Sequence, residues 1–96
     1  MGERARAFIV IRCQAYEGRF HFYVERCIRA GDLKGWMRVI QKPMYDYIEM
    51  ELEGSKYQMD KFIANLQKGP PDAKTSGLEI SWKTHKAMYK GFQIRP

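Results

Sequence analysis

The sequence has little cysteine and no long apolar run. The two cysteines, Cys13 and Cys27, are too few for a disulfide scaffold. Together with the two histidines they lack the paired spacing of a zinc site, so we expect reduced thiols, no metal and no cofactor. Charged residues interrupt every apolar stretch well before the roughly 18 residues of a membrane-spanning helix, and residues 7–11 are too short for a signal-peptide core. These absences predict a soluble, cytoplasmic protein without a membrane partner.

The length and composition predict one folded domain over residues 1–96. A chain of 96 residues is too short for two independent cores, and 45% hydrophobic with 29% charged residues can fill one core and cover it. The net charge of +6 favours an anionic partner such as a phosphate or a nucleic acid. Residues 1–42 and 61–96 carry about +5 each, whereas residues 43–60 carry about −4.

Apolar periodicity divides the chain into strands and helices. Uninterrupted apolar residues predict a central strand over 7–11, and β-compatible residues predict strands over 33–40, 78–82 and 92–94. Helical spacing predicts amphipathic helices over about 20–28 and 59–66, the second preceded by a capping box of Ser55 and Gln58.

The segment 47–53 alternates more regularly than any other part of the chain. Ile48, Met50 and Leu52 share one face. Tyr47 and the glutamates at 49, 51 and 53 share the other. This pattern predicts a strand with one solvent-exposed, acidic face.

The element order is β-α-β-β-α-β with a short extra C-terminal strand. Two helices with a single apolar face each can bury it by lying together on one side of a sheet. We therefore expect an α+β, two-layer, ferredoxin-like sandwich, with an antiparallel sheet and both helices on one face.

Several motifs, in order, resemble the acylphosphatase family. Residues 33–38, Leu-Lys-Gly-Trp-Met-Arg, resemble its "L-x-G-W-V-R" strand, and residues 20–24, Phe-His-Phe-Tyr-Val, are similar to its "F-R-x-F-V". Residues 48–54, 62–73 and 92–95 resemble its later blocks, including "F-x-x-x-L-x-x-G-P-x-x-A". The resemblance covers essentially the whole chain, from about residue 5 to 95.

The resemblance implies metal-independent hydrolysis of acyl phosphates to a carboxylate and inorganic phosphate. In such a family the turn before the first helix wraps its backbone amides around the phosphate, helped by the positive end of that helix. An Arg neutralises the phosphoryl group and an Asn orients the attacking water. By this resemblance the anion-binding residues are Tyr16, Glu17, Gly18, Arg19, Phe20 and His21.

The chain departs from the family at both catalytic positions. The Arg position falls at His21 and the Asn position at Val39. A histidine lacks the bidentate fork of a guanidinium, and a valine cannot hydrogen-bond water. Because losing one such group typically costs about 10²–10³ in rate, we expect the family activity to be lost or strongly reduced.

Two alternatives stay open. In the first, the chain is an active acylphosphatase with a rearranged phosphate loop in which Arg19 replaces the missing arginine. In the second, it is a ferredoxin-like binding module for protein or RNA. The acidic strand 47–53 disfavours nucleic acid, because its glutamates would repel a phosphate backbone. We therefore expect a small phosphate-bearing anion or an acyl phosphate as the partner.

Overall fold

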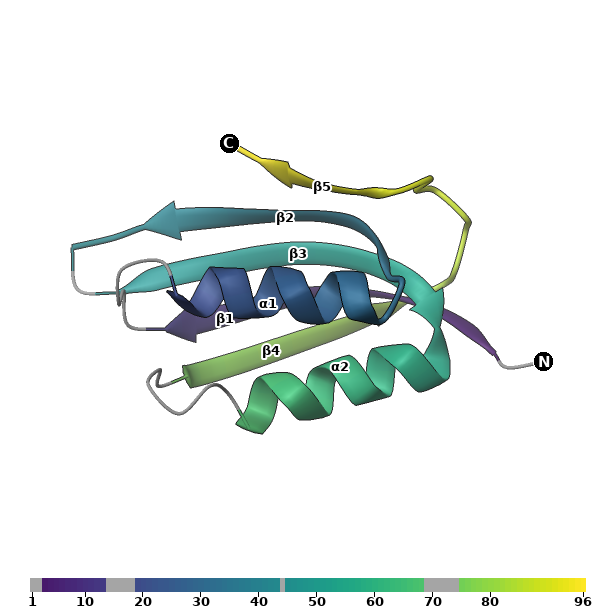
Figure 1. Cartoon of the computed structure of the whole chain (residues 1–96), viewed down its shortest axis with the longest axis horizontal. Helices are drawn as coiled ribbons and strands as arrows, with labels where there is room; N and C mark the ends of the chain where they lie inside the picture. The colour runs from purple at the N-terminus through teal and green to yellow at the C-terminus, as the bar shows by residue number, and fades with distance from the viewer. Residues whose placement is uncertain (1–2, 14–18, 44, 69–74) are drawn as a thin grey trace.

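Two helices cover one face of a five-stranded sheet (Figure 1). The computed structural model describes residues 3–13, 19–43, 45–68 and 75–96. The elements in chain order are β1 (Arg4–Cys13), α1 (Arg19–Ala30), β2 (Lys34–Gln41), β3 (Asp46–Ser55), α2 (Lys56–Lys68), β4 (Thr75–Lys83) and β5 (Phe92–Arg95). This confirms the ferredoxin-like order with an extra C-terminal strand.

The sheet has the strand order β4-β1-β3-β2-β5. Strands β1 to β4 pair in antiparallel fashion, as expected, but β5 pairs with β2 in parallel, so the sheet is mixed. The parallel pairing of β5 with β2 follows from the direction in which the chain leaves β4. Because β4 ends at the end of the sheet where β2 begins, the strand that follows it runs in the same direction as β2.

The core lies between the helices and the sheet. The apolar positions predicted from the spacing are buried on both layers: Val24, Ile28, Met59, Phe62 and Leu66 on the helices and Ile9, Ile11, Met37, Ile48, Met50 and Leu52 on the sheet. The predicted helix cap is also present, since the backbone N–H of Gln58 donates to Ser55 Oγ at 3.1 Å. The periodicity of the sequence therefore places both helices correctly.

Gly35 holds β2 close against β3. Its φ of 143° lies in a region that favours glycine, and a Cβ atom there would sit 1.9 Å from the Glu51 carbonyl oxygen. The glycine of the "G-W" motif thus allows the close approach of two backbones.

The expectation that 51 and 53 would face solvent is wrong. Glu51 and Glu53 are buried, whereas Glu49 is partly exposed and pairs with Arg38. The Glu53 carboxylate accepts hydrogen bonds from the backbone N–H groups of Lys86, Met88 and Tyr89 at 3.0, 2.7 and 3.2 Å. The connection between β4 and β5 therefore lies over this part of the open sheet face, and Glu53 fastens it there.

Candidate functional site

The candidate anion site lies at one end of the sheet. Figure 1 shows that β1 ends, α1 begins and β2 ends at this same end. The fold thus brings the sequence positions 19–21 and 39 to one region, although they belong to different elements. Tyr16, Glu17 and Gly18 lie outside the described residues.

The first turn of α1 supplies the helix end that an anion site needs. Arg19 and Phe20 are its first two residues, although their side chains are outside the structural description. No acidic residue occurs in this first turn. The free N–H groups and the positive end of the helix dipole therefore have no carboxylate in that turn competing with a bound anion.

His21 occupies the third position of α1. Its half-buried imidazole stacks on the exposed ring of Phe22, with 5.7 Å between the ring centroids and 5° between the planes. The two ring nitrogens point in different directions, so an imidazole offers an anion one N–H at a time and does not reproduce the two parallel bonds of a guanidinium.

Val39 lies near the end of β2, on the face that packs against the helices. It pairs with Ile48 of β3 and is half-buried against the hydrophobic core. Its neighbour Arg38 points to the opposite face and pairs there with Glu49. Position 39 therefore contributes apolar packing to this end of the sheet and no group that can hold a water molecule.

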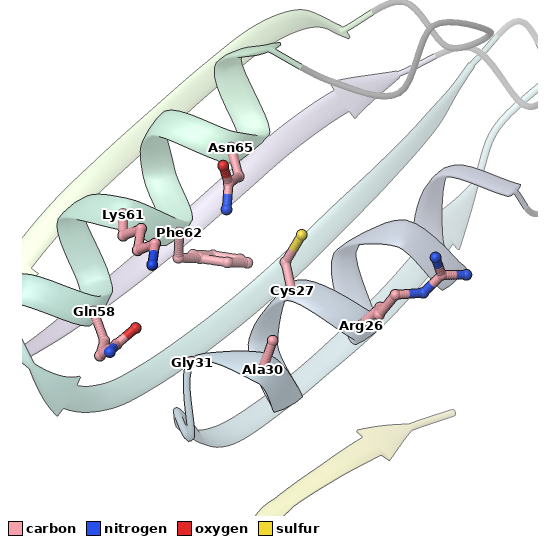
Figure 2. Close-up of a pocket in the computed structure, with 8 residues that line it drawn as sticks. All are labelled: Arg26, Cys27, Ala30, Gly31, Gln58, Lys61, Phe62 and Asn65. Carbon is pink, nitrogen blue, oxygen red and sulfur yellow. The ribbon is translucent and has the colours of Figure 1, made fainter.

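A separate groove runs between α1 and α2 (Figure 2). It has a volume of about 190 Å³ and follows the second half of α1, away from the turn that precedes the helix. Figure 2 shows the Cys27 thiol pointing into the space between the helices. Burial raises the pKa of this free thiol, which outweighs the lowering by a hydrogen bond with Tyr23 and by Arg26. The thiol is protonated at neutral pH, as suits a packing residue rather than a nucleophile.

The open face of the sheet is less acidic than the alternation predicted. Glu51 accepts hydrogen bonds from Tyr89 Oη at 2.6 Å and Arg6 at 3.1 Å, and Lys83 lies 3.6 Å from it. Burial alone raises the pKa of Glu51, but these partners outweigh it and hold the pKa below its usual value. The three backbone N–H groups that donate to Glu53 likewise outweigh its burial and hold its pKa below the usual value. Tyr89 and the backbone donors to Glu53 lie in an irregular segment without a periodic pattern, and Arg6 and Lys83 are brought near Glu51 by strand pairing, so the sequence did not reveal these partners.

Neither a metal site nor a membrane span is found in the described part of the chain. No group of three or more His, Cys, Asp or Glu side chains converges among those residues. Over the same ranges, no helix is both long enough and apolar enough to cross a bilayer.

The element order and the sheet topology define a ferredoxin-like α+β protein. The family model for acylphosphatase matches residues 11–94, and the chain belongs to that family. An acylphosphatase from Pyrobaculum aerophilum is 29% identical over 94 residues, covering 98% of this chain and 97% of that protein. One from Syntrophotalea carbinolica is 31% identical over 75 residues, covering 78% and 77%.

Solved structures share the fold at lower identity. The crystal structure of an acylphosphatase from Bacillus subtilis superposes with a TM-score of 0.80 at 16% identity, covering 96% of this chain and 99% of that one. Full-length HypF, in a phosphate- and nucleotide-bound form, contains a similar region: a TM-score of 0.81 at 20% identity covers all of this chain and 12% of that one. At these identities the likeness concerns the fold alone.

Proposed function

We propose that this chain binds a small phosphate-bearing anion at the turn before α1, and that its hydrolysis of acyl phosphates is lost or strongly reduced. In the family reaction, water attacks phosphorus, the bond from phosphorus to the acyl oxygen breaks, and a carboxylate and inorganic phosphate leave. Catalysis consists mainly of orienting that water and neutralising the phosphoryl oxygens. Both tasks fall to side chains that this sequence replaces.

The packing of the half-buried Val39 side chain against apolar neighbours supports the proposal of reduced activity. A side chain packed against the core near Ile48 has no donor or acceptor for the attacking water. His21 adds a second deficit, because an imidazole lacks the bidentate fork of a guanidinium. With each missing group costing about 10²–10³ in rate, the two together would remove most of the family's acceleration.

The first turn of α1 supports the binding half of the proposal. Amide N–H groups at a helix N-terminus bind phosphate without a catalytic side chain, and the first turn of α1 itself has no acidic residue, so Glu17 just before the helix is the one carboxylate of positions 16–21 that opposes the anion. Binding and catalysis are therefore separable here. The protein would act as an anion-binding member of a hydrolase family, without a metal ion.

Titration with inorganic phosphate, followed by amide chemical shifts, tests the binding. We expect saturable shifts in residues 19–22 and a weaker affinity in Arg19→Ala and His21→Ala. The matched control is Arg29→Ala, which removes a cation from the far end of the same helix. Shifts spread over the surface, or an affinity equally reduced by Arg29→Ala, would contradict a site at this turn.

The rearranged active enzyme is tested by turnover. Robust, chelator-resistant hydrolysis of benzoyl phosphate that is lost in Arg19→Ala would support that alternative and overturn the proposed loss of activity. A rate near the uncatalysed one, unchanged in Arg19→Ala, supports the proposal.

A further inference from the structure

One outer edge of the sheet is long and carries a self-complementary pattern. Strand β4 has nine residues and occupies the edge beyond β1, and among the strands the structure describes it pairs with β1 alone (Figure 1). The other edge strand, β5, has four residues and is followed by Pro96. Since a long unpaired strand can template pairing with another strand, β4 is the edge that offers a docking surface.

The two faces of β4 carry different chemistry. Register with β1 places Glu79 and Lys83 on the open face, opposite Val10 and Arg6. Ile80 and Trp82 lie on the helix face, opposite Ile9 and Ala7. Trp82 is 46% exposed, an unusual exposure for an indole on the face of the sheet that packs against helices.

We propose that β4 pairs with β4 of a second copy of this chain, antiparallel, about a two-fold axis at Ser81. In this register Glu79 of each copy lies opposite Lys83 of the other, so two opposite-charge pairs form on the open face. On the helix face Ile80 of each copy lies opposite Trp82 of the other. Opposite charges and aromatic with β-branched side chains are both favourable cross-strand pairs.

Other two-fold registers fit less well. An axis at residue 79 places two glutamates opposite each other, and an axis at residue 83 does the same with two lysines. An axis at residue 80 places Lys83 opposite Gly77, and one at residue 82 places Lys83 opposite Ser81. The register centred on Ser81 is the one that matches charges and apolar side chains together. Because the relation is two-fold, each favourable pair occurs twice.

Neighbouring residues are compatible with this dimer. The Lys83 side chain is 43% exposed and its nitrogen lies 3.6 Å from Glu51 of β3, so the ammonium must turn outward, across the edge, to pair with Glu79 of the second copy. The Lys56 ammonium lies 4.6 Å from the centre of the Trp82 rings, within the range of a cation–π contact, and helps to hold the indole. β4 lies three strands away from β2, which carries Val39. The dimer would therefore leave Val39 uncovered, and its existence does not depend on the proposed function.

A disulfide trap tests the register. In a background of Cys13→Ser and Cys27→Ala, Ser81→Cys places two thiols directly opposite each other, at a Cα separation of about 4.5–5.5 Å that suits a disulfide. Gly77→Cys is the matched control, because residue 77 lies on the same face of β4, faces residue 85 of the second copy and removes no charge pair. Under mild oxidation we expect Ser81→Cys to form covalent dimers at least about tenfold faster than Gly77→Cys. Equal rates would overturn the register.

Sedimentation velocity tests the dimer itself. We expect the wild-type chain to dimerise at micromolar concentration and Glu79→Lys to weaken the dimer by about tenfold, because both charge pairs become repulsive. Glu25→Lys, which makes the same charge change on α1, should leave the dimer intact. A monomeric wild type up to about 1 mM, or a dimer unaffected by Glu79→Lys, would overturn the proposal.

Discussion

Glu53 should contribute more to stability than Glu49, the partly exposed carboxylate on the same face of β3. Glu53 is 3% exposed, and its carboxylate accepts three backbone hydrogen bonds from the connection between β4 and β5. A hydrogen bond to a charged group contributes about 1.5–3 kcal/mol, and a donor left buried and unpaired costs about 1–3 kcal/mol. Because Lys86 and Met88 are exposed, their N–H groups can turn to water in a variant, so about 1 kcal/mol for each bond is the better value.

We therefore expect Glu53→Ala to lower the free energy of unfolding by about 3 kcal/mol, measured by urea denaturation. Amide hydrogen exchange should show lost protection at Lys86, Met88 and Tyr89. Glu49→Ala is the matched control, because Glu49 lies on the same face and strand in an exposed pair with Arg38 worth about 0–1 kcal/mol. If the two variants were equally destabilised, or if those amides kept their protection, the reasoning would be refuted.

Three further outcomes follow from named contacts. The pKa values of Glu51 and Glu53 lie below the usual 4.5, so the stabilisation by these carboxylates is fully present above that pH and is lost as the pH falls through the lowered values. The urea midpoint should therefore fall less on acidification in Glu53→Ala than in the wild type. Parallel curves of urea midpoint against pH would contradict this. Because burial raises the pKa of Cys27, its alkylation by iodoacetamide at pH 7 should be slower than that of a free cysteine peptide; an equal rate would contradict the packing role. Ser55→Ala should cost about 1 kcal/mol in urea denaturation by removing the acceptor of the Gln58 N–H, whereas Ser55→Asp should retain most of the stability.

The sequence correctly predicted the features that depend on a short repeat of apolar residues along a strand or a helix. The alternation of Ile48, Met50 and Leu52 and the helical spacing of Val24 and Ile28 follow directly from how each element buries one face. Each of these patterns is local, so no knowledge of the neighbouring elements is needed.

The features that were missed depend on contacts distant in the sequence. The burial of Glu51 and Glu53 is caused by residues more than 30 positions away, in a segment without periodicity. The parallel pairing of β5 depends on where β4 ends relative to β2. In the candidate site, the family motifs predicted positions 21 and 39 by counting from the "G-W" pair, and only the structure places Val39 against the core.

The hydrolysis rate of benzoyl phosphate, compared between the wild type and the double variant His21→Arg/Val39→Asn, tests the central claim most directly. The variant restores both family residues, so the rate should rise from near the uncatalysed value by at least about 10², with chelator present throughout. Each single variant should recover less than the double variant, because the two groups act in the same step. Robust turnover by the wild type, with no gain in the double variant, would contradict the account.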